Sequence, residues 1–382
     1  MERRKIVLVT AGGHVSNFHA SMKEMRRYSE KRNIGLDFLG ARGGLTGLIN
    51  GKFQEIFDVD IDENRAGSLI GCDREIADTG KIIDVVKTNN IYTIIMMGGD
   101  NHLGEGVRLS KAGVRVIGWP KTMDGDLSSG VTLGWDTAVT VGVRQTRKHF
   151  NSAMTNGRIF YVGLFGRNTD WVPAAVSLYG GAQRCIPCEQ EYEWEQVFDK
   201  ISQDSKENYE KFGKNFAVVN FSEGARIRGM NPPPKGHCDL DKHGQPKLQP
   251  EWVGLELVRL TKKGGKKACF ECYTYSMRDE PPTKTDIALA RMSGRECMKM
   301  VLDEDFGKSV VFVPEGDFYK ASRALLEEVA VQKKMRDTDY FDYNELRTRD
   351  CFDDDFGRLF RGSLGEPPRI ENLAYKNMLR EK

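Results

Sequence analysis

The segment 120–126 concentrates side chains that could move a proton and bind a phosphate. It reads Pro-Lys-Thr-Met-Asp-Gly-Asp and supplies the carboxylates of Asp124 and Asp126, the amine of Lys121 and the hydroxyl of Thr122. One carboxylate can accept a proton, a second can hold a metal ion, and the amine can face a phosphate. The competing interpretation is an ordinary charged turn, because Asp and Gly are common turn residues.

A second acidic group, Asp100, follows another short apolar run. Residues 93–97 predict a buried strand that ends at two glycines, of which the second is Gly99, and a helix is expected over 102–112. Backbone N–H groups that are exposed where a strand gives way to a helix favour a phosphate. Asp100 could hold a magnesium ion bridging that phosphate, because Mg²⁺ is bound by carboxylate and phosphate oxygens.

These motifs belong to a longer alternation of apolar runs and helical patterns. Strands are expected at 5–10, 36–39, 93–97 and 114–119, and helices at 73–89, 102–112 and 133–153. We expect Ile76, Ile83 and Val86 to form the apolar face of the first helix. The alternation predicts an α/β fold with a parallel sheet covered on both faces. Ligands bind such sheets at the carboxyl ends of the strands, where Gly12 and Gly13 offer another phosphate cradle.

The alternation restarts after about residue 150, as expected for a second domain. Strands are expected at 159–165 and 217–221, a helix at 252–262 and a hairpin at 239–248. We therefore predict two Rossmann-like three-layer αβα domains with parallel-type sheets. Their expected bounds are 1–140, with helices from about 280–318 packing back onto it, then 141–279, and finally a C-terminal extension at 319–382.

The composition narrows the class of protein. The chain has 382 residues, an apolar fraction of 39% and a net charge of +2 with acids and bases mixed. That balance gives no electrostatic case for nucleic acid or an anionic membrane. No apolar run reaches the eighteen residues of a transmembrane helix, and the apolar run near the N-terminus is too short for a signal peptide. We expect a cytoplasmic protein whose eight cysteines are reduced.

Two Cys-x-x-Cys pairs, at 185–188 and 269–272, need a separate interpretation. Four cysteines could ligate zinc. Both pairs, however, lie in segments that are predicted to be extended, and residues three apart on a strand point to opposite faces. We favour buried structural cysteines over a zinc site.

The ordered set of motifs resembles the phosphofructokinase family over residues 5–315. The spacing between Arg158 and Arg167 also matches that family. The matching pieces, in family order, are Gly12-Gly13, 70–74 (IGCDR), 98–100 (GGD), 120–126 (PKTMDGD), 165–167 (FGR), Glu223-Gly224 and 275–278 (YSMR). The resemblance implies the phosphofructokinase fold, a magnesium cofactor and transfer of a phosphoryl group to the 1-hydroxyl of fructose 6-phosphate.

The resemblance also implies roles for single residues. Asp124 would be the general base, Asp126 would support it and Asp100 would coordinate magnesium. Lys121 and Thr122 would bind the transferred phosphoryl group. The other donor-phosphate contacts would come from Gly12, Gly13, Arg74, Gly99 and Asn101.

On the sugar side, the resemblance implies that Arg167 counters charge in the transition state. Glu223 would bind the sugar hydroxyls, Tyr275 and Arg278 would hold the 6-phosphate, and Arg158 would reach that phosphate from a neighbouring subunit. That last role implies a homodimer or a homotetramer. Structural alternatives stay open: Arg158 could be salt-bridged or solvated, as could Arg74, Glu223 could cap the next segment, and Tyr275 could be core packing.

Family members use ATP or pyrophosphate as donor. Glycine after the metal aspartate is common in ATP users and aspartate in pyrophosphate users, whereas this chain has Asn101. Lysine at the position of Lys121 is common in pyrophosphate users but also occurs in some ATP users. The glycine between Asp124 and Asp126, the segment 275–278 and the hairpin 239–248 resemble the pyrophosphate-dependent 6-phosphofructokinases. We therefore favour pyrophosphate.

Two departures keep other hypotheses open. The first loop lacks the family's acid and Pro-Gly pair and has His19 in place of asparagine, and Phe165 replaces a methionine. The alternatives are an ATP-dependent 6-phosphofructokinase, a related kinase of another sugar such as sedoheptulose 7-phosphate, and a catalytically weak regulatory paralogue.

Overall fold

The chain folds into two compact units. A computed structural model describes residues 3–13, 17–56, 59–349 and 355–374. The first unit runs to Thr137 and resumes over Arg278–Lys333, and the second comprises Ala138–Met277 and the described residues after Lys333. The chain therefore passes from one unit to the other three times. The first passage lies near residue 140, where the sequence predicts a domain boundary.

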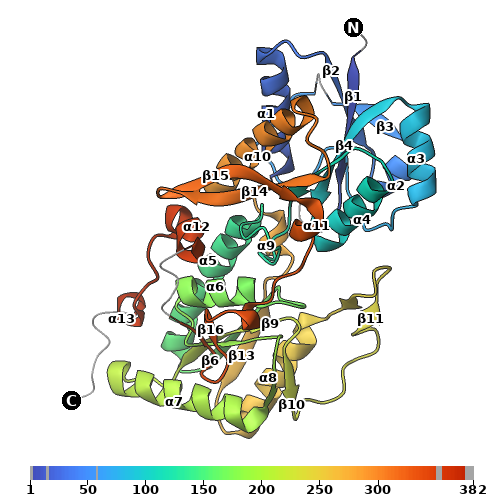
Figure 1. Cartoon of the computed structure of the whole chain (residues 1–382). Coiled ribbons are helices and arrows are strands. Elements are labelled where there is room, and N and C mark those ends of the chain that lie inside the picture. Colours follow the sequence, from blue (N-terminus) through green and yellow to red (C-terminus); the bar gives the residue numbers. More distant parts are fainter. Residues whose placement is uncertain (1–2, 14–16, 57–58, 350–354, 375–382) are drawn as a thin grey trace. The chain divides into compact units, whose positions relative to one another are not determined.

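The first unit contains a seven-stranded sheet in the order β15-β14-β5-β4-β1-β2-β3 (Figure 1). The strands are β1 (Arg4–Thr10), β2 (Leu36–Ala41), β3 (Phe53–Glu55), β4 (Ile91–Gly98), β5 (Val116–Pro120), β14 (Lys308–Glu315) and β15 (Phe318–Leu325). The five central strands are parallel, and the edge strands β3 and β15 are antiparallel to their neighbours. The predicted parallel sheet is thus extended by antiparallel edges.

Helices cover both faces of this sheet (Figure 1). On one face lie α1 (Phe18–Lys31) and α10 (Lys284–Leu302), and on the other lie α2 (Leu45–Ile49), α3 (Thr79–Thr88), α4 (Asp100–Lys111) and α11 (Leu326–Val329). The α10 helix approaches α1 closely at Gly294, where a Cβ atom would overlap the backbone carbonyl of Ser21. A larger residue at Gly294 would force these two helices apart.

The predicted helix 73–89 begins later than expected. Its first residue is Thr79, because the carboxylate of Asp78 caps it by accepting a hydrogen bond from the Lys81 N–H at 3.1 Å. Ile76 therefore lies outside the helix and is 42% exposed, whereas the fully buried residue is Ile82. The prediction of Ile76 as part of the apolar face is wrong.

The second unit contains a four-stranded parallel sheet in the order β13-β6-β9-β7. These strands are β6 (Ile159–Leu164), β7 (Arg184–Ile186), β9 (Ala217–Ser222) and β13 (Ala268–Cys272). One face packs against α7 (Trp194–Phe212) and α8 (Pro250–Lys263), and the other against α5 (Trp135–Asn156) and α6 (Trp171–Gly180). The remaining elements are short: β8 (Glu191–Glu193), β10 (Arg226–Arg228), β11 (Asp239–Leu240), β12 (Pro246–Lys247), α9 (Ser276–Asp279), η1 (Met335–Asp337), β16 (Phe341–Asp342), β17 (Arg347–Thr348), α12 (Asp355–Leu364) and α13 (Ile370–Leu373).

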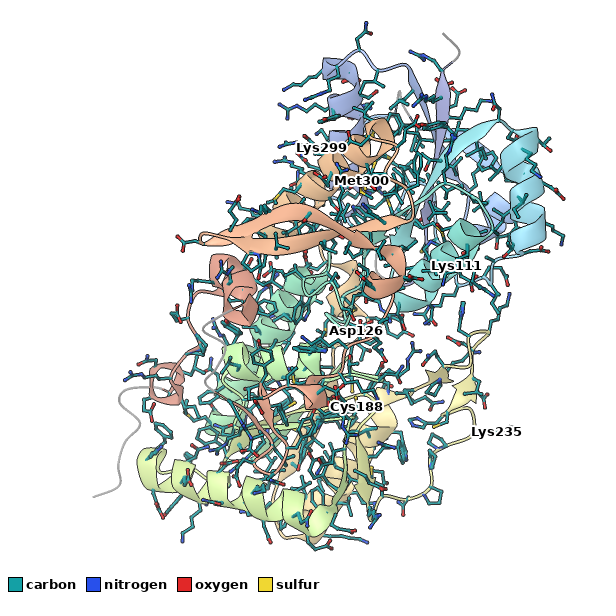
Figure 2. The ribbon with its side chains drawn as sticks, viewed as in Figure 1. Lys111, Asp126, Cys188, Lys235, Lys299 and Met300 are labelled. Atoms are coloured by element: carbon teal, nitrogen blue, oxygen red, sulfur yellow. The ribbon has the colours of Figure 1, made fainter. Side chains whose placement is uncertain are left out.

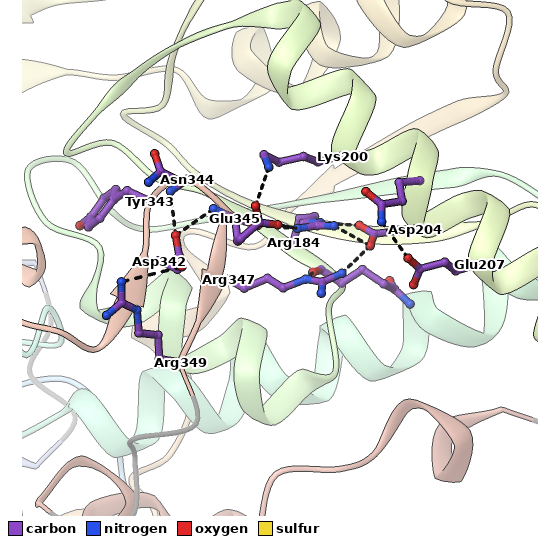
Figure 3. Close-up of polar contacts among 12 residues, drawn as sticks. Arg184, Lys200, Asp204, Glu207, Asp342, Tyr343, Asn344, Glu345, Arg347 and Arg349 are labelled. Atoms are coloured by element: carbon purple, nitrogen blue, oxygen red, sulfur yellow. Dashed lines mark hydrogen bonds and ion pairs between the residues drawn. The ribbon is translucent and has the colours of Figure 1, made fainter.

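The residues that we expect to form a C-terminal extension, 319–382, are divided between the units instead. β15 completes the first sheet, and β16 and β17 are anchored in the second unit by buried charges (Figure 3). Asp204 accepts hydrogen bonds at 2.6 Å and 2.9 Å from the guanidinium of Arg184, and it also pairs with Arg347. Both Arg184 and Asp204 are almost fully buried, so removing either one would leave the other as an uncompensated buried charge.

The cysteine pairs are kept apart by the sheet order. Cys185 lies on β7 and Cys269 and Cys272 lie on β13, with β6 and β9 between them. Three interstrand spacings of about 4.8 Å separate these edges, too far for one zinc ion. Among the described residues, no group of three or more His, Cys, Asp or Glu side chains converges on a metal position. None of the helices in the described ranges is long and apolar enough to span a membrane.

Candidate active site

The motifs of the first unit meet at the carboxyl edge of its sheet. β4 and β5 are parallel neighbours, and the Lys121 N–H donates to the Gly98 carbonyl at 3.0 Å. On the other side of β4, the Ala11 N–H donates to the Met97 carbonyl at 3.0 Å. The three loops after β1, β4 and β5 are therefore adjacent, as the strand order requires.

The loop after β5 presents an oriented carboxylate. Thr122 Oγ1 donates to Asp124 Oδ2 at 2.9 Å and accepts from the Asp124 N–H at 3.1 Å. Gly125 has φ +67°, a backbone conformation that other residues rarely adopt, and a Cβ atom there would overlap the Trp135 ring. The turn between Asp124 and Asp126 therefore strongly favours a glycine at this position. The turn leaves Asp124 half-buried and Asp126 buried.

The three acidic residues of this edge influence one another. Asp126 is labelled in Figure 2, and its side chain is buried. Burial raises its pKa well above the usual value, and the negative charges of Asp124 and Asp100 raise it further. A cation bound near these carboxylates would relieve this repulsion. Mg²⁺ is commonly held by one or two carboxylates together with substrate phosphates. Asp100 with donor oxygens therefore fits a magnesium site, although no all-protein cage exists among the described residues.

Cationic groups surround the glycines of the first loop. The buried Lys121 donates from Nζ to the Ala11 carbonyl, and a Cβ atom at Gly12 would lie 3.3 Å from that nitrogen. A Cβ atom at Gly13 would lie 2.9 Å from Nη1 of Arg278. Two cations thus border backbone that carries no side chains, an arrangement suited to a phosphate.

Lys121 has a perturbed pKa. The pKa of Lys121 is lowered to about 8, mainly by burial. Cys72 and Asp124 oppose this change, whereas the charges of Arg278 and Arg74 add to it. The charge of Arg74 is therefore felt at this loop, although the residue itself is exposed. A bound phosphate would favour the protonated amine.

The N-terminus of α4 faces the same loop. Gly99 precedes α4, and a Cβ atom at Gly99 would lie 3.5 Å from Thr122 Cβ. Asn101 is exposed, and its Nδ2 donates to Asp100 Oδ1 at 3.3 Å. Asn101 therefore orients the candidate metal ligand while presenting bulk without charge.

The second unit brings three predicted sugar-side residues to the carboxyl edge of its own sheet. Arg167 follows β6 and Glu223 follows the adjacent parallel strand β9, where the Glu223 N–H donates to the Leu164 carbonyl at 2.9 Å. Arg167 Nη1 donates to the Pro246 carbonyl of the β11–β12 hairpin at 3.4 Å. Tyr275 follows β13, the other neighbour of β6.

The exposure of Tyr275 decides between its two interpretations. Its side chain is 71% exposed, and its ring meets Phe165 edge-on with 6.1 Å between centroids. The alternative that Tyr275 is core packing is wrong. Tyr275 therefore lies at the surface, shortly after the carboxyl end of β13.

Arg158 lies at the opposite end of the sheet from these three residues. It precedes β6, whereas Arg167 follows that six-residue strand, so about 20 Å of extended chain separates the two ends. Within its own subunit, Arg158 donates to Ser152 Oγ at 2.8 Å and lies over the Phe160 ring. Arg158 cannot join the carboxyl edge of its own sheet.

Three residues make contacts that the sequence alone does not predict. Arg278, which we expect on the sugar side, belongs to the first unit and lies against Gly13. His19 uses both ring nitrogens, accepting from the Leu69 N–H at 3.1 Å and contacting the Arg65 carbonyl at 3.1 Å. Gln332 donates to Asp126 at 2.7 Å from far along the chain. Of the altered first loop, residues 14–16 lie outside the described ranges.

The sequence comparisons agree with this geometry. Residues 5–301 match the family described as phosphofructokinase. The pyrophosphate–fructose 6-phosphate 1-phosphotransferase of Amycolatopsis methanolica is 27% identical over 316 residues, covering 80% of this chain and 89% of that protein. The ATP-dependent 6-phosphofructokinase 2 of Streptomyces coelicolor is 28% identical over 335 residues, covering 81% of this chain and 93% of that protein.

A solved structure shares the fold across almost the whole chain. The pyrophosphate-dependent phosphofructokinase of Marinobacter aquaeolei superposes with a TM-score of 0.78 and 19% identity, covering 99% of this chain and 98% of that one. The predicted fold class is therefore confirmed. Because the family match also spans most of the sequence, the chain belongs to the phosphofructokinase family.

Proposed function

We propose that this protein transfers a phosphoryl group from pyrophosphate to the 1-hydroxyl of fructose 6-phosphate. The products are fructose 1,6-bisphosphate and phosphate, and the reaction is reversible. One observation carries the proposal: Asp124, held by Thr122, lies on the same sheet edge as Asp100 and the buried cation Lys121. That edge combines a base, a metal ligand and a phosphate-binding cation, which phosphoryl transfer requires.

The proposed chemistry begins at the sugar hydroxyl. Asp124 accepts the hydroxyl proton while the alkoxide oxygen attacks the terminal phosphorus of pyrophosphate, and the bridging P–O bond breaks to release phosphate. Thr122 holds Asp124 at 2.9 Å, so the base needs little reorientation. Asp126 supports that base, and Lys121 and Thr122 bind the phosphoryl group. When bound by Asp100 and donor oxygens, Mg²⁺ supplies positive charge against the charge on the phosphates.

The second unit supplies the proposed sugar side. Glu223 would bind hydroxyls, Tyr275 would bind the 6-phosphate, and Arg167 would counter charge on the transferred group. Arg158 would act from a neighbouring subunit, since it lies at the opposite end of β6 from this edge. The active enzyme would therefore be at least a dimer.

Pyrophosphate is the preferred donor because the site favours a compact anion. The amine of Lys121 lies close to Gly12, and Asn101 places a side chain at the start of α4, where a nucleoside would need space. The main competitor is ATP, because relatives that use either donor have nearly the same identity to this chain.

A paired assay tests the donor. Purified protein with Mg²⁺ and fructose 6-phosphate should turn over with pyrophosphate and without nucleotide, and phosphate should drive the reverse reaction. Asp124→Ser should abolish both directions and leave sugar-phosphate binding largely intact. Turnover with ATP alone would overturn the donor assignment, and turnover that persists in Asp124→Ser would remove the proposed base.

The altered first loop supports a second candidate, a catalytically weak regulatory paralogue. It has His19 where the family has asparagine, and both ring nitrogens of His19 contact the backbone of the 65–69 loop. Binding of fructose 6-phosphate without turnover of either donor, or of sedoheptulose 7-phosphate in its place, would favour this candidate.

A further inference from the structure

Residues 331–333 form a short antiparallel contact with the loop after β5 (residues 121–128), which is the catalytic loop of the proposed function. The Ser128 N–H donates to the Val331 carbonyl at 3.0 Å, Leu127 bridges Gln332, and the Lys333 N–H donates to the Asp126 carbonyl at 2.6 Å. The backbone on both sides of Gln332 is thus fixed relative to Asp126. The family match ends at residue 301, so this segment lies outside it.

The Gln332 side chain completes the contact. Its Nε2 donates to Asp126 Oδ2 at 2.7 Å, and Asp126 is only 5% exposed. A buried carboxyl group in such a place needs hydrogen-bond partners, because water is largely excluded. The hydrogen bond also fixes the rotation of the carboxylate, since the Gln332 backbone is itself paired.

The chemistry of an amide suits this position. A lysine would neutralise Asp126 and lower its value as a support for the neighbouring base. A glutamate would place another acidic group beside Asp126, whose pKa the charges of Asp124 and Asp100 already raise. Glutamine donates one strong hydrogen bond and changes no charge.

We propose that Gln332 is a positioning residue for the phosphoryl-transfer reaction, acting through its hydrogen bond to the Asp126 carboxylate. This inference rests on the proposed function, in which Asp126 supports the base. Because Gln332 acts through Asp126, it should influence the catalytic step and leave substrate binding nearly unchanged.

Steady-state kinetics test the role. Gln332→Leu keeps the size of the side chain but removes the donor, and we expect kcat to fall about tenfold, consistent with loss of a hydrogen bond to a charged group. The KM values for sugar phosphate and donor should stay within about twofold. Gln332→Glu should reduce kcat further at neutral pH. The matched control is Val331→Ala, whose side chain is 53% exposed and whose backbone bonds remain.

Thermal unfolding tests the contact without any turnover. Gln332→Leu should lower Tm by about 2–4 °C in the wild-type background. In a protein that already carries Asp126→Ala, Gln332→Leu should change Tm little, because the acceptor of the hydrogen bond is already absent.

The outcomes separate the two proposals. Wild-type kcat in Gln332→Leu, or a rise in KM with unchanged kcat, would overturn the positioning role. An equal Tm shift in both backgrounds would overturn the contact itself. An inactive wild type with a coupled Tm response would reject the proposed function and the role in catalysis, but would retain the Gln332–Asp126 hydrogen bond.

Discussion

At the scale of single residues, Lys121 combines burial with a proposed role that requires charge. Its amine is enclosed among Ala11, Gly12 and the neighbouring cations, and burial is the main cause of its lowered pKa. Below pH 8 the amine is mostly protonated and can hold a phosphate; as pH rises through 8, that charge is lost. Donor binding should therefore weaken in alkaline solution.

The pH profile of kcat/KM for the donor measures this effect, because it reports groups of the free enzyme. The wild type should lose kcat/KM as pH rises through about 8. Lys121→Arg should lack this decline, since a guanidinium stays charged throughout the range. Titration of the donor itself affects both proteins equally. An identical alkaline decline in Lys121→Arg would exclude Lys121 as its source.

Residue types and spacing in the sequence predict much of the first unit's site. Asp100, Thr122, Asp124 and Lys121 are adjacent because parallel neighbouring strands bring their carboxyl ends together. Gln332 could not be predicted in this way. It belongs to no motif, and only the pairing of 331–333 with the catalytic loop brings it to Asp126.

At the scale of elements, the turn between β5 and α5 determines where the carboxylates lie. Gly125 and Gly130 both have positive φ, at +67° and +81°. They differ in surroundings: a Cβ atom at Gly125 would overlap the Trp135 ring, whereas one at Gly130 has no atom within 4 Å. Substitutions at these two glycines can therefore distinguish the effect of backbone strain from that of steric overlap within one loop.

Gly125→Ala should therefore destabilise the protein by at least about 2 kcal/mol, from strain and overpacking together, and should reduce activity. Gly130→Ala should cost only the strain, about 1 kcal/mol. Chemical denaturation of both variants measures the difference. Equal losses of unfolding free energy would show that the Trp135 ring moves aside without cost.

Element boundaries were harder to predict than element types. The apolar spacing of residues 73–89 predicts a helix, but Asp73 accepts from the Leu45 and Thr46 N–H groups at 3.0 Å and 2.8 Å. Asp78 then caps the helix five residues later. Periodicity alone does not distinguish a carboxylate that caps one helix from a carboxylate inside another.

At the scale of the whole molecule, the role proposed for Arg158 implies that activity depends on assembly. Arg158 and Arg167 lie at opposite ends of β6, so a site that uses both needs Arg158 from another copy. The sequence shows the spacing of these residues, but only the strand between them shows that they cannot meet within one subunit.

Mixing two inactive variants tests this sharing. Asp124→Ser and Arg158→Ala homo-oligomers should each have low activity. After they are dissociated and reassembled together, some sites should combine an intact Asp124 with an intact Arg158, and activity should reappear. A mixture no more active than the sum of its parts would show that each site takes Arg158 from its own chain.

The division of the chain between two units also sets an order for synthesis on the ribosome. All strands of the second sheet lie between Ile159 and Cys272, so they emerge consecutively. The first sheet begins at Arg4 but cannot be completed before β14 is made. β14 pairs with β5 across nearly two hundred residues of intervening chain. Domains tend to fold as units while the chain is made, so the nascent inserted sheet can form before the one that it interrupts. The catalytic loop can gain its Gln332 contact only after both sheets' strands have been made.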